Sequence, residues 1–358
     1  MPALQLFLIG APRSGKSTVF NALTLTPEGQ SSFTKGQHHL GTVKVPDARL
    51  AALRDMYKPA KYTPAEVTFV DVAMPPTPDG KGALSQLTTF LGDADAFVIV
   101  AQAFGEMDYR GKPVDPADQL ESVLLELVVT DLERTEKRLE KIAHEKGRGL
   151  KINEMEASAL EKCRAHMEKE LPLRTLTALS PEEEKATRSL QLLSAKPVMV
   201  IANVSEERLD GKGLDKLRAA CAKLNMEPIV FCASLEAEMA QLDPEAQSEF
   251  LKDYGLNEPA RVRFIQMAYR LLDLISFFTV GEDEVRAWTI RRGTQALHAA
   301  GKIHTDLERG FIRAEVVRNE ELLKTQSWAA CQKNATLRLE GKTYEVQDGD
   351  VMHIRHNA

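Results

Sequence analysis

The chain has 358 residues, of which 43% are hydrophobic and 27% are charged. This length predicts two or three domains with substantial cores, and the composition excludes an intrinsically disordered or collagen-like chain. The formal net charge of −6 argues against a protein that coats nucleic acid with its whole surface, and it leaves room only for a local basic face.

The four cysteines are scattered, without a C-x-x-C pair or a histidine at zinc-finger spacing. They predict neither a disulfide framework nor a structural metal, in keeping with a reducing cytosol. The chain enters an apolar segment at Leu4 without a basic region before it, and no apolar run approaches the ~18 residues of a membrane span. We therefore expect a cytoplasmic protein with no membrane partner.

Five short apolar runs in the first and third quarters of the chain predict buried strands. Their hydrophobicity is continuous rather than alternating, which is typical of parallel strands covered on both faces. Segments with helical periodicity, such as 18–25 and 214–224, separate some of these runs, so the pattern is βαβ and predicts an α/β fold with a parallel sheet. The predicted strands are Leu4–Ile9, Glu66–Asp71, Ala96–Ala101, Pro197–Asn203 and Glu227–Ala233.

The first predicted strand leads directly into Gly10-Ala-Pro-Arg-Ser-Gly-Lys-Ser17, which matches the phosphate-loop motif G-x-x-x-x-G-K-S/T and precedes a predicted helix. The glycines let successive backbone N–H groups point at phosphate oxygens, and the helix N-terminus adds partial positive charge. Lys16 is expected to bridge the terminal phosphates, and Ser17 to supply a hydroxyl ligand to Mg²⁺.

A carboxylate is predicted to help hold the same Mg²⁺. Asp71 ends the second predicted strand, where P-loop folds place the acid that binds the metal through water. A lone carboxylate at a strand end also serves as a helix cap or loop residue, and this alternative stays open. Lys16 and Asp71 are the predicted catalytic residues, and Ser17 and Asp71 are the predicted metal ligands.

The long interval before the fourth predicted strand has the pattern of a helical hairpin inserted in the sheet domain. Apolar residues recur at helical spacing over 118–146, and a second such stretch covers 153–171. Gly147 and Gly149 break the pattern between the two amphipathic helices. Two interpretations of the charged outer face stay open, because it is either solvated surface or a partner-binding surface.

Asn203 and Glu206 lie at the carboxyl end of the fourth predicted strand, where open α/β sheets bind ligands. Sites that select guanine carry N-K-x-D here, whereas this chain has Val204 for the lysine and the longer Glu206 for the aspartate. We expect guanine to be read less well and adenine to be admitted. Ser234 follows the next strand, in the second base-side loop. Alternatively, Asn203 only caps its strand and Glu206 only begins a helix.

After Leu274 the sequence becomes rich in β-branched and aromatic segments with turn signals between them, which predicts a small mixed β domain of roughly 80 residues. A local excess of basic residues there has two open interpretations, an RNA-facing patch or ordinary surface charge. The predicted strands are Ile275–Thr279, Ala287–Ile290, Ile312–Val317, Thr336–Leu339 and Thr343–Val346. The basic residues are Arg286, Arg291, Arg292, Lys302, Arg309, Arg313 and Arg318.

Several longer stretches make the chain similar to the YchF / Obg-like ATPase family of P-loop NTPases over nearly its whole length. The C-terminal stretches are similar to the TGS domain, with its β-grasp-like fold, that closes this family. The stretches are Gly-Lys-Ser-Thr-Val-Phe-Asn-Ala-Leu-Thr (15–24), Gly-Thr-Val-Lys-Val-Pro-Asp-Ala-Arg-Leu (41–50), Asn203-x-x-Glu206, Cys-Ala-Ser-Leu-Glu-Ala-Glu (232–238), Phe277-Phe-Thr-Val-Gly, Arg309-Gly-Phe-Ile-Arg-Ala-Glu and Val346-Gln-Asp-Gly-Asp-Val.

The resemblance implies a three-part molecule that hydrolyses ATP in preference to GTP, needs Mg²⁺ and associates with ribosomes or RNA through its hairpin and TGS domain. No DNA partner is expected. The implied parts are a nucleotide domain (1–117 and 191–274), the inserted hairpin (118–190) and the TGS domain (275–358). The implied nucleotide contacts are Gly10, Arg13, Ser14, Gly15, Lys16, Ser17 and Thr18 for the phosphates, and Asn203, Glu206 and Ser234 for the base.

Departures from the family pattern bear on the mechanism. Arg13-Ser14 replaces the usual Asn-Val in the phosphate loop, and Lys35 stands where the first switch is expected to hold a Mg²⁺-binding threonine. In the second switch, Met74 replaces a glycine whose N–H would bind the γ-phosphate, and a side chain disfavours positive φ. The adjacent His38 and His39 have no carboxylate cluster that would make a metal site.

Two functions are therefore compatible with the sequence. The first is an enzyme, a Mg²⁺-dependent hydrolase of ATP or, less favoured, GTP, with slow intrinsic turnover because no side chain is an obvious base for water. The second is a nucleotide-binding ribosome or RNA adaptor with little hydrolysis, which the altered second switch favours. A P-loop kinase is poorly supported because nothing resembles an arginine-rich lid.

Overall fold

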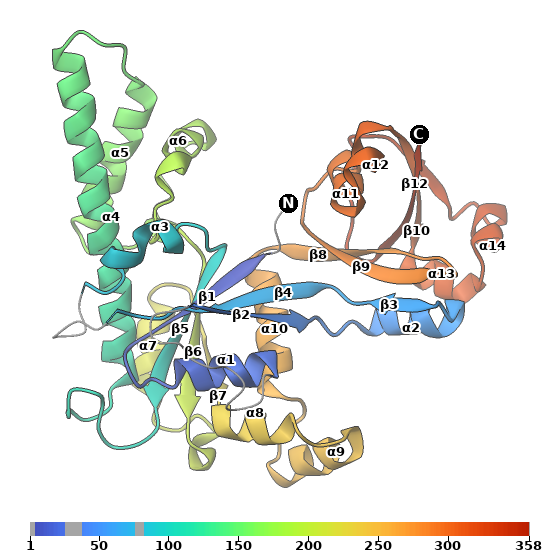
Figure 1. Ribbon diagram of the computed structural model, residues 1–358, viewed down its shortest axis with the longest axis horizontal. Coiled ribbons are helices and arrows are strands. Elements are labelled where there is room, and N and C mark those ends of the chain that lie inside the picture. Colours follow the sequence, from blue (N-terminus) through green and yellow to red (C-terminus); the bar gives the residue numbers. More distant parts are fainter. Residues whose placement is uncertain (1–3, 26–37, 76–81, 358) are drawn as a thin grey trace. The chain divides into compact units, whose positions relative to one another are not determined.

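The computed structural model describes residues 4–25, 38–75 and 82–357, which form two compact units (Figure 1). One unit comprises the described residues within Leu4–Gly41 and Thr68–Phe264. The other comprises 42–67 and 265–357. The three-part division expected from the resemblance stays a prediction, although residues 42–67 group with the C-terminal part and not with the residues on either side of them.

The sheet of the first unit has six strands in the order β2-β4-β1-β5-β6-β7, of which β2 and β4 extend past the unit's boundaries at residues 41 and 68. The pairs β1–β4, β1–β5, β5–β6 and β6–β7 are all parallel, so the predicted parallel sheet is confirmed. Every residue of β5 is buried, as expected for a strand covered on both faces. The strands are β1 (Gln5–Ile9), β2 (His39–Lys44), β4 (Glu66–Asp71), β5 (Ala96–Ala103), β6 (Val198–Val204) and β7 (Pro228–Phe231).

The helices of this unit follow the strands in the expected βαβ alternation. The predicted segments 18–25 and 214–224 correspond to α1 and α7. The helices are α1 (Lys16–Thr24), α3 (Thr88–Leu91), α4 (Pro116–Gly147), α5 (Glu154–Met167), α6 (Pro181–Thr187), α7 (Asp215–Ala222), α8 (Ala233–Met239), α9 (Pro244–Asp253) and α10 (Ala260–Leu271), of which α10 continues into the second unit. Short 3₁₀ turns lie at Ser85–Leu87, Leu173–Thr175, Arg188–Leu190 and Glu206–Arg208.

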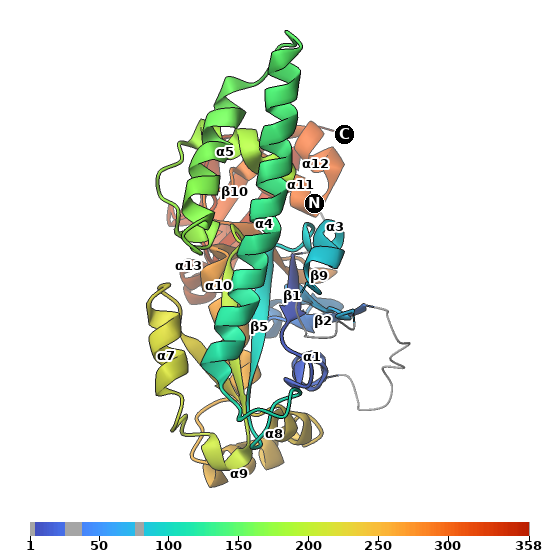
Figure 2. The same cartoon turned by 90° about the vertical axis from the view of Figure 1, so that its left-hand side faces the viewer.

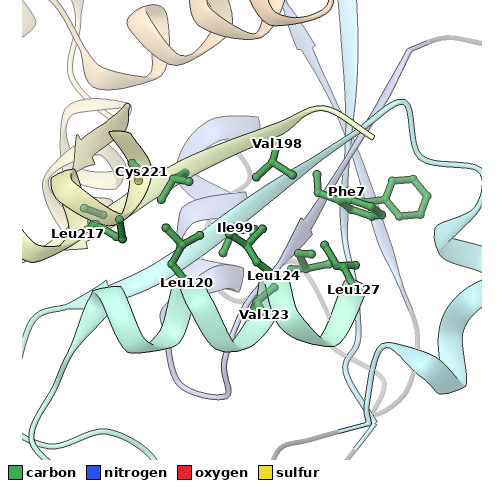
Figure 3. Packing of buried hydrophobic residues seen from close by; sticks show 14 of the residues in the cluster. Phe7, Ile99, Leu120, Val123, Leu124, Leu127, Val198, Leu217 and Cys221 are labelled. Atoms are coloured by element: carbon green, nitrogen blue, oxygen red, sulfur yellow. The ribbon is translucent and has the colours of Figure 1, made fainter. Parts of the chain in front are cut away.

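The first half of α4 covers the sheet and forms the main core of this unit. Pro116 occupies its first turn and Asp115 caps it, accepting the N–H groups of Ala117 and Asp118 at 3.0 and 3.3 Å. Each leucine that is fully buried on this face contributes roughly 1.5–3 kcal/mol. Figure 3 shows Leu120, Val123, Leu124 and Leu127 of α4 packed with Ile99 and Val198 of the strands and with Leu217 and Cys221 of α7.

The second half of α4 pairs with α5 as the predicted hairpin, and α4 is a single helix from the sheet to the tip (Figure 2). Arg138 on α4 binds both carboxylate oxygens of Glu156 on α5, at 2.6 and 2.8 Å. At the base, the fully buried carboxylate of Asp131 accepts the backbone N–H groups of Leu193 and Ser194 at 2.8 and 2.6 Å. These bonds hold α4 to the segment that leads into β6.

The second unit has a mixed six-stranded sheet with the order β11-β10-β12-β8-β9-β3, so the predicted mixed β region is confirmed. The pairs β8–β9, β10–β12 and β10–β11 are antiparallel, and β12–β8 and β3–β9 are parallel. The strands are β3 (Lys61–Thr63), β8 (Leu274–Thr279), β9 (Glu284–Arg291), β10 (Phe311–Arg318), β11 (Arg338–Glu340) and β12 (Asp350–His356). The helices are α2 (Ala48–Tyr57), α11 (Ala296–Ile303), α12 (Thr305–Arg309), α13 (Asn319–Thr325) and α14 (Trp328–Lys333).

The predicted strand Thr343–Val346 is wrong. This segment forms no strand and has one isolated bridge, between Glu345 and Gln295. The Tyr344 hydroxyl donates to the fully buried carboxylate of Asp350 at 2.7 Å, and the Gln347 N–H donates to the same oxygen at 2.9 Å. These two bonds fold the backbone into a turn. The real strand is β12, which begins at Asp350.

All four cysteines are buried and free, and burial raises the thiol pKa of Cys163 and Cys221 to about 11. At pH 8 the thiolate fraction of these two residues is then on the order of 0.1%. We expect a chromogenic disulfide reagent to label neither thiol in the folded protein and all four cysteines in denaturant. Rapid labelling of Cys163 or Cys221 in the folded protein would contradict this packing.

No helix among the described residues is long and apolar enough to cross a membrane.

Candidate functional site

The phosphate loop joins β1 to α1, and its two glycines are required by close approach. A Cβ atom on Gly10 would lie 2.5 Å from the Val100 carbonyl oxygen. Gly15 has φ 80°, and its Cβ would lie 2.2 Å from the side-chain amide nitrogen of Asn203. Arg13 also has positive φ, at 61°, and its side chain is exposed. The loop therefore holds a backbone shape that only glycine allows at these two points.

Three of the predicted site residues meet at the start of α1. The Lys16 ammonium contacts the Asp71 carboxylate and donates to the Val72 carbonyl at 2.8 Å. The Ser17 hydroxyl donates to the second carboxylate oxygen of Asp71 at 2.7 Å. The Asp71 residue is 3% exposed, so this charge is held by specific partners and not by water.

The oxygen donors of Ser17 and Asp71 fit Mg²⁺ better than a softer metal. Hydroxyl and carboxylate oxygens are hard ligands, and Mg²⁺ in nucleotide sites takes one or two protein oxygens and completes its shell with phosphates and water. Among the described residues, no group of three or more His, Cys, Asp or Glu side chains is placed to hold a metal by itself. The metal assignment of Ser17 and Asp71 stays a prediction that this donor set supports.

Asn203 ties two loops together. Its side-chain N–H donates to the Ser14 carbonyl at 3.1 Å, and its side-chain oxygen accepts the Ala233 N–H at 3.3 Å. Asn203 is 4% exposed, and β6 places it directly beneath the phosphate loop. We predicted that Asn203 contacts the base. Its side-chain amide also joins the phosphate loop to the first residue of α8. This second role depends on a contact between distant segments, which sequence alone does not show.

The other two predicted base-side residues are exposed at the same edge of the sheet. Glu206 opens the 3₁₀ turn after β6, and it accepts a hydrogen bond from the Tyr254 hydroxyl at 3.4 Å. Ser234 lies in the first turn of α8, with its hydroxyl 3.2 Å from the Cys232 sulfur. Both side chains are therefore accessible to a base, and their role as base contacts stays a prediction.

A cavity of about 940 Å³ opens beside the phosphate loop and continues along α4. Residues 10–18 form one wall, and Met74 and Pro75 of the second switch form part of another. Arg110 lines it as well, donating to Asp108 at 2.8 Å and Asp118 at 3.0 Å. Sequence reasoning missed Arg110, because only the fold brings the loop between β5 and α4 to this cavity.

Gln119 of α4 is a further cavity residue that we did not predict. It is 4% exposed, and its side-chain oxygen accepts the Gln102 N–H at 2.8 Å. The predicted base contacts Asn203, Glu206 and Ser234 are not among the described residues that line this cavity. The first-switch expectation for Lys35 lies outside the described residues.

Comparison with known proteins decides the family. The "Ribosome-binding ATPase YchF" of Bacillus subtilis (strain 168) is 37% identical to this chain over 99% of the chain and 100% of that protein. The chain belongs to the YchF family. The protein of the same name from Escherichia coli O157:H7 is 38% identical over 98% of both chains.

The structure and the C-terminal region agree with YchF membership. The solved "Structure of the Schizosaccharomyces pombe YchF GTPase" matches with a TM-score of 0.85 and 28% identity, covering 99% of both chains. This match confirms the P-loop NTPase fold that the sequence predicted. A family model named YchF-GTPase_C, described as "Protein of unknown function (DUF933)", matches residues 274–357.

Proposed function

We propose that this YchF-family protein is a cytoplasmic, Mg²⁺-dependent nucleotide hydrolase that prefers ATP to GTP. The observation that carries this proposal is the convergence of Lys16, Ser17 and Asp71 beside the glycine-bounded loop, with a cavity along the same loop. The relatives named as ATPases are similar over nearly their full length, which supports the same class of reaction.

The chemistry follows from these groups. Hydrolysis of a phosphoric anhydride places developing charge on the phosphoryl oxygens, and fixed donors stabilise that charge best. Lys16 would exchange its contacts with Asp71 and Val72 for contacts with the terminal phosphates. The backbone N–H groups of the loop would bind phosphate oxygens. Ser17 and Asp71 would hold Mg²⁺, which neutralises phosphate charge. Asn203 keeps the loop in shape, since it binds the Ser14 carbonyl.

We propose that the C-terminal region is a TGS domain and that it and the α4–α5 hairpin bind the ribosome. The relatives are named ribosome-binding, which supports this partner. Within the C-terminal unit, the Arg286 guanidinium lies 3.9 Å over the Trp288 ring, an arrangement that also suits stacking on a nucleic-acid base.

A second function, nucleotide binding with little hydrolysis, keeps one observation in its favour. Met74 stands at the cavity wall where the family pattern has glycine, and Pro75 follows it. A side chain restricts the backbone geometry that would aim the Met74 N–H at a phosphate, and Pro75 offers no N–H.

Phosphate release from purified protein separates the two functions. ATP and GTP are compared with and without Mg²⁺ and with and without ribosomes. We expect slow, Mg²⁺-dependent release from ATP that ribosomes accelerate. Tight binding of nucleotide without release under any of these conditions would establish the second function instead.

Shortening Glu206 tests how the base is read. We expect Glu206→Asp to lower the ratio of ATP to GTP affinity by roughly tenfold, because the shorter carboxylate accepts two guanine N–H groups and the longer one fits them poorly. Glu207→Asp is the matched control, since Glu207 is the adjacent exposed glutamate and its change should leave the ratio unaltered. Calorimetry with both nucleotides measures the ratio. An unchanged ratio in Glu206→Asp would remove Glu206 from the base site.

A further inference from the structure

One peptide unit in the second switch is held at both ends. The carbonyl of Val72 accepts the Lys16 ammonium at 2.8 Å, and the N–H of Ala73 donates to the Nδ1 atom of His38 at 3.1 Å. These two groups belong to the same peptide plane, which directly follows Asp71. The plane therefore lies between the lysine of the phosphate loop and a histidine that precedes β2.

The His38 ring is fixed by stacking. The centroids of the His38 and Phe90 rings are 3.7 Å apart, and the two ring planes differ by 11°. The Phe90 ring centroid lies 4.9 Å from that of Phe7 in the core. Nδ1 accepts a hydrogen bond, so the proton of the neutral ring is on Nε2. Burial, followed by the charge of Lys16, lowers the pKa of His38, which agrees with a neutral ring at pH 7.

We propose that His38 is a positioning residue for the nucleotide hydrolysis proposed above, because it holds the Val72–Ala73 peptide in place when Lys16 turns to the phosphates. Once the ammonium leaves the Val72 carbonyl, the bond to His38 is the hydrogen bond that still orients this plane among the residues that the structure describes. The next residue along is Met74 at the cavity wall. A fixed plane before Met74 limits the directions in which its N–H points, in a segment that lacks the family glycine.

Two substitutions separate the hydrogen bond from the stacking. His38→Phe keeps an aromatic ring for Phe90 but has no acceptor. His38→Asn loses the ring but places an amide oxygen near the Nδ1 position, so it retains an acceptor for the Ala73 N–H. Hydrogen–deuterium exchange at single-residue resolution reports on Ala73 directly. The Val72 N–H, which donates to Leu8 at 3.3 Å within the sheet, is the internal reference.

We expect His38→Phe to speed exchange at Ala73 about fivefold to tenfold, the effect of losing one hydrogen bond, with Val72 unchanged. In the same variant kcat for ATP should fall about threefold to tenfold at nearly unchanged KM. The reason is that the orientation of the Val72–Ala73 peptide affects the reaction step more than nucleotide binding. His38→Asn should restore exchange and kcat to within about twofold of the wild-type values.

Unchanged Ala73 exchange in His38→Phe would overturn the assignment, and acceleration in His38→Asn alone would make stacking the cause. Equal acceleration in both variants would overturn the assignment as well, because a retained acceptor would then not protect the Ala73 N–H. Faster exchange with unaltered kcat would overturn the positioning role. A wild-type protein without turnover refutes the proposed hydrolysis instead. In that case exchange measured with a non-hydrolysable ATP analogue and Mg²⁺ still decides whether His38 holds Ala73.

Discussion

Replacing Lys16 by alanine is expected to lower kcat for ATP by roughly two to three orders of magnitude. The ammonium is the charged donor at the start of α1, and the loop amides alone cannot match its effect on developing phosphate charge. The change also leaves the carboxylate of Asp71, which is 3% exposed, without its cation. Repulsion between this carboxylate and the phosphates should weaken binding in the absence of Mg²⁺. Phosphate release and calorimetry, each with and without Mg²⁺, measure the two effects.

Lys223→Ala is the matched control, because Lys223 is an exposed lysine at the end of α7. We expect it to keep wild-type turnover. Thermal unfolding of both variants shows whether the Lys16 variant is folded at the assay temperature. A folded Lys16→Ala protein that retains turnover within about threefold of wild type would contradict the proposed hydrolysis. A roughly threefold loss of rate corresponds to less free energy than one hydrogen bond to a charged group contributes.

Gly15→Ala is expected to lower nucleotide affinity roughly 100-fold, the scale of effect that follows an ångström-sized misplacement of a binding group. The added Cβ would meet the Asn203 amide at 2.2 Å, so either the loop or Asn203 must move. The left-handed backbone at φ 80° adds a cost of about 1–2 kcal/mol for a residue with a side chain. Calorimetry with ATP and Mg²⁺ and a denaturant titration measure the two losses.

Gly147→Ala is its matched control, because a Cβ at Gly147 in α4 would meet nothing within 4 Å. This change should leave affinity unaltered and stabilise the helix slightly. The double variant Gly15→Ala/Asn203→Ala adds a further test. Since both residues act through one contact, the double variant should lose less stability than the two single variants lose together. Strict additivity would show that the Gly15–Asn203 contact is not what limits this position.

The parallel sheet was predictable because its strands are buried on both faces and read as continuous apolar runs. Three strands of the described part of the chain that we missed lack that signal. β2 has one buried residue, Val43, among half-buried and exposed ones, and β3 is only three residues long, so neither reads as a continuous apolar run. β12 has exposed polar residues from His353 onward and begins directly after a turn, and we therefore placed a strand a few residues too early, at 343–346.

In the candidate site, the local motif was readable and the long-range contacts were not. Gly15, Lys16 and Ser17 follow one another in a known pattern, and Asp71 stands at a strand end, so sequence alone named the residues that the structure brings together. The contact of Ala73 with His38, and the position of Arg110 at the cavity, join segments separated by many residues. No spacing rule connects such residues, and only the folded chain shows them as neighbours.

The continuity of α4 has a mechanical consequence. Its first half lines the cavity beside the phosphate loop, and its second half carries the hairpin tip, with no break among its 32 residues. At 1.5 Å per residue the helix is about 48 Å long, so a tilt of about 5° at the cavity end displaces the far end by about 4 Å. A rigid helix of this length would therefore convert a small tilt at its cavity end into a displacement of several ångströms at the distal loop.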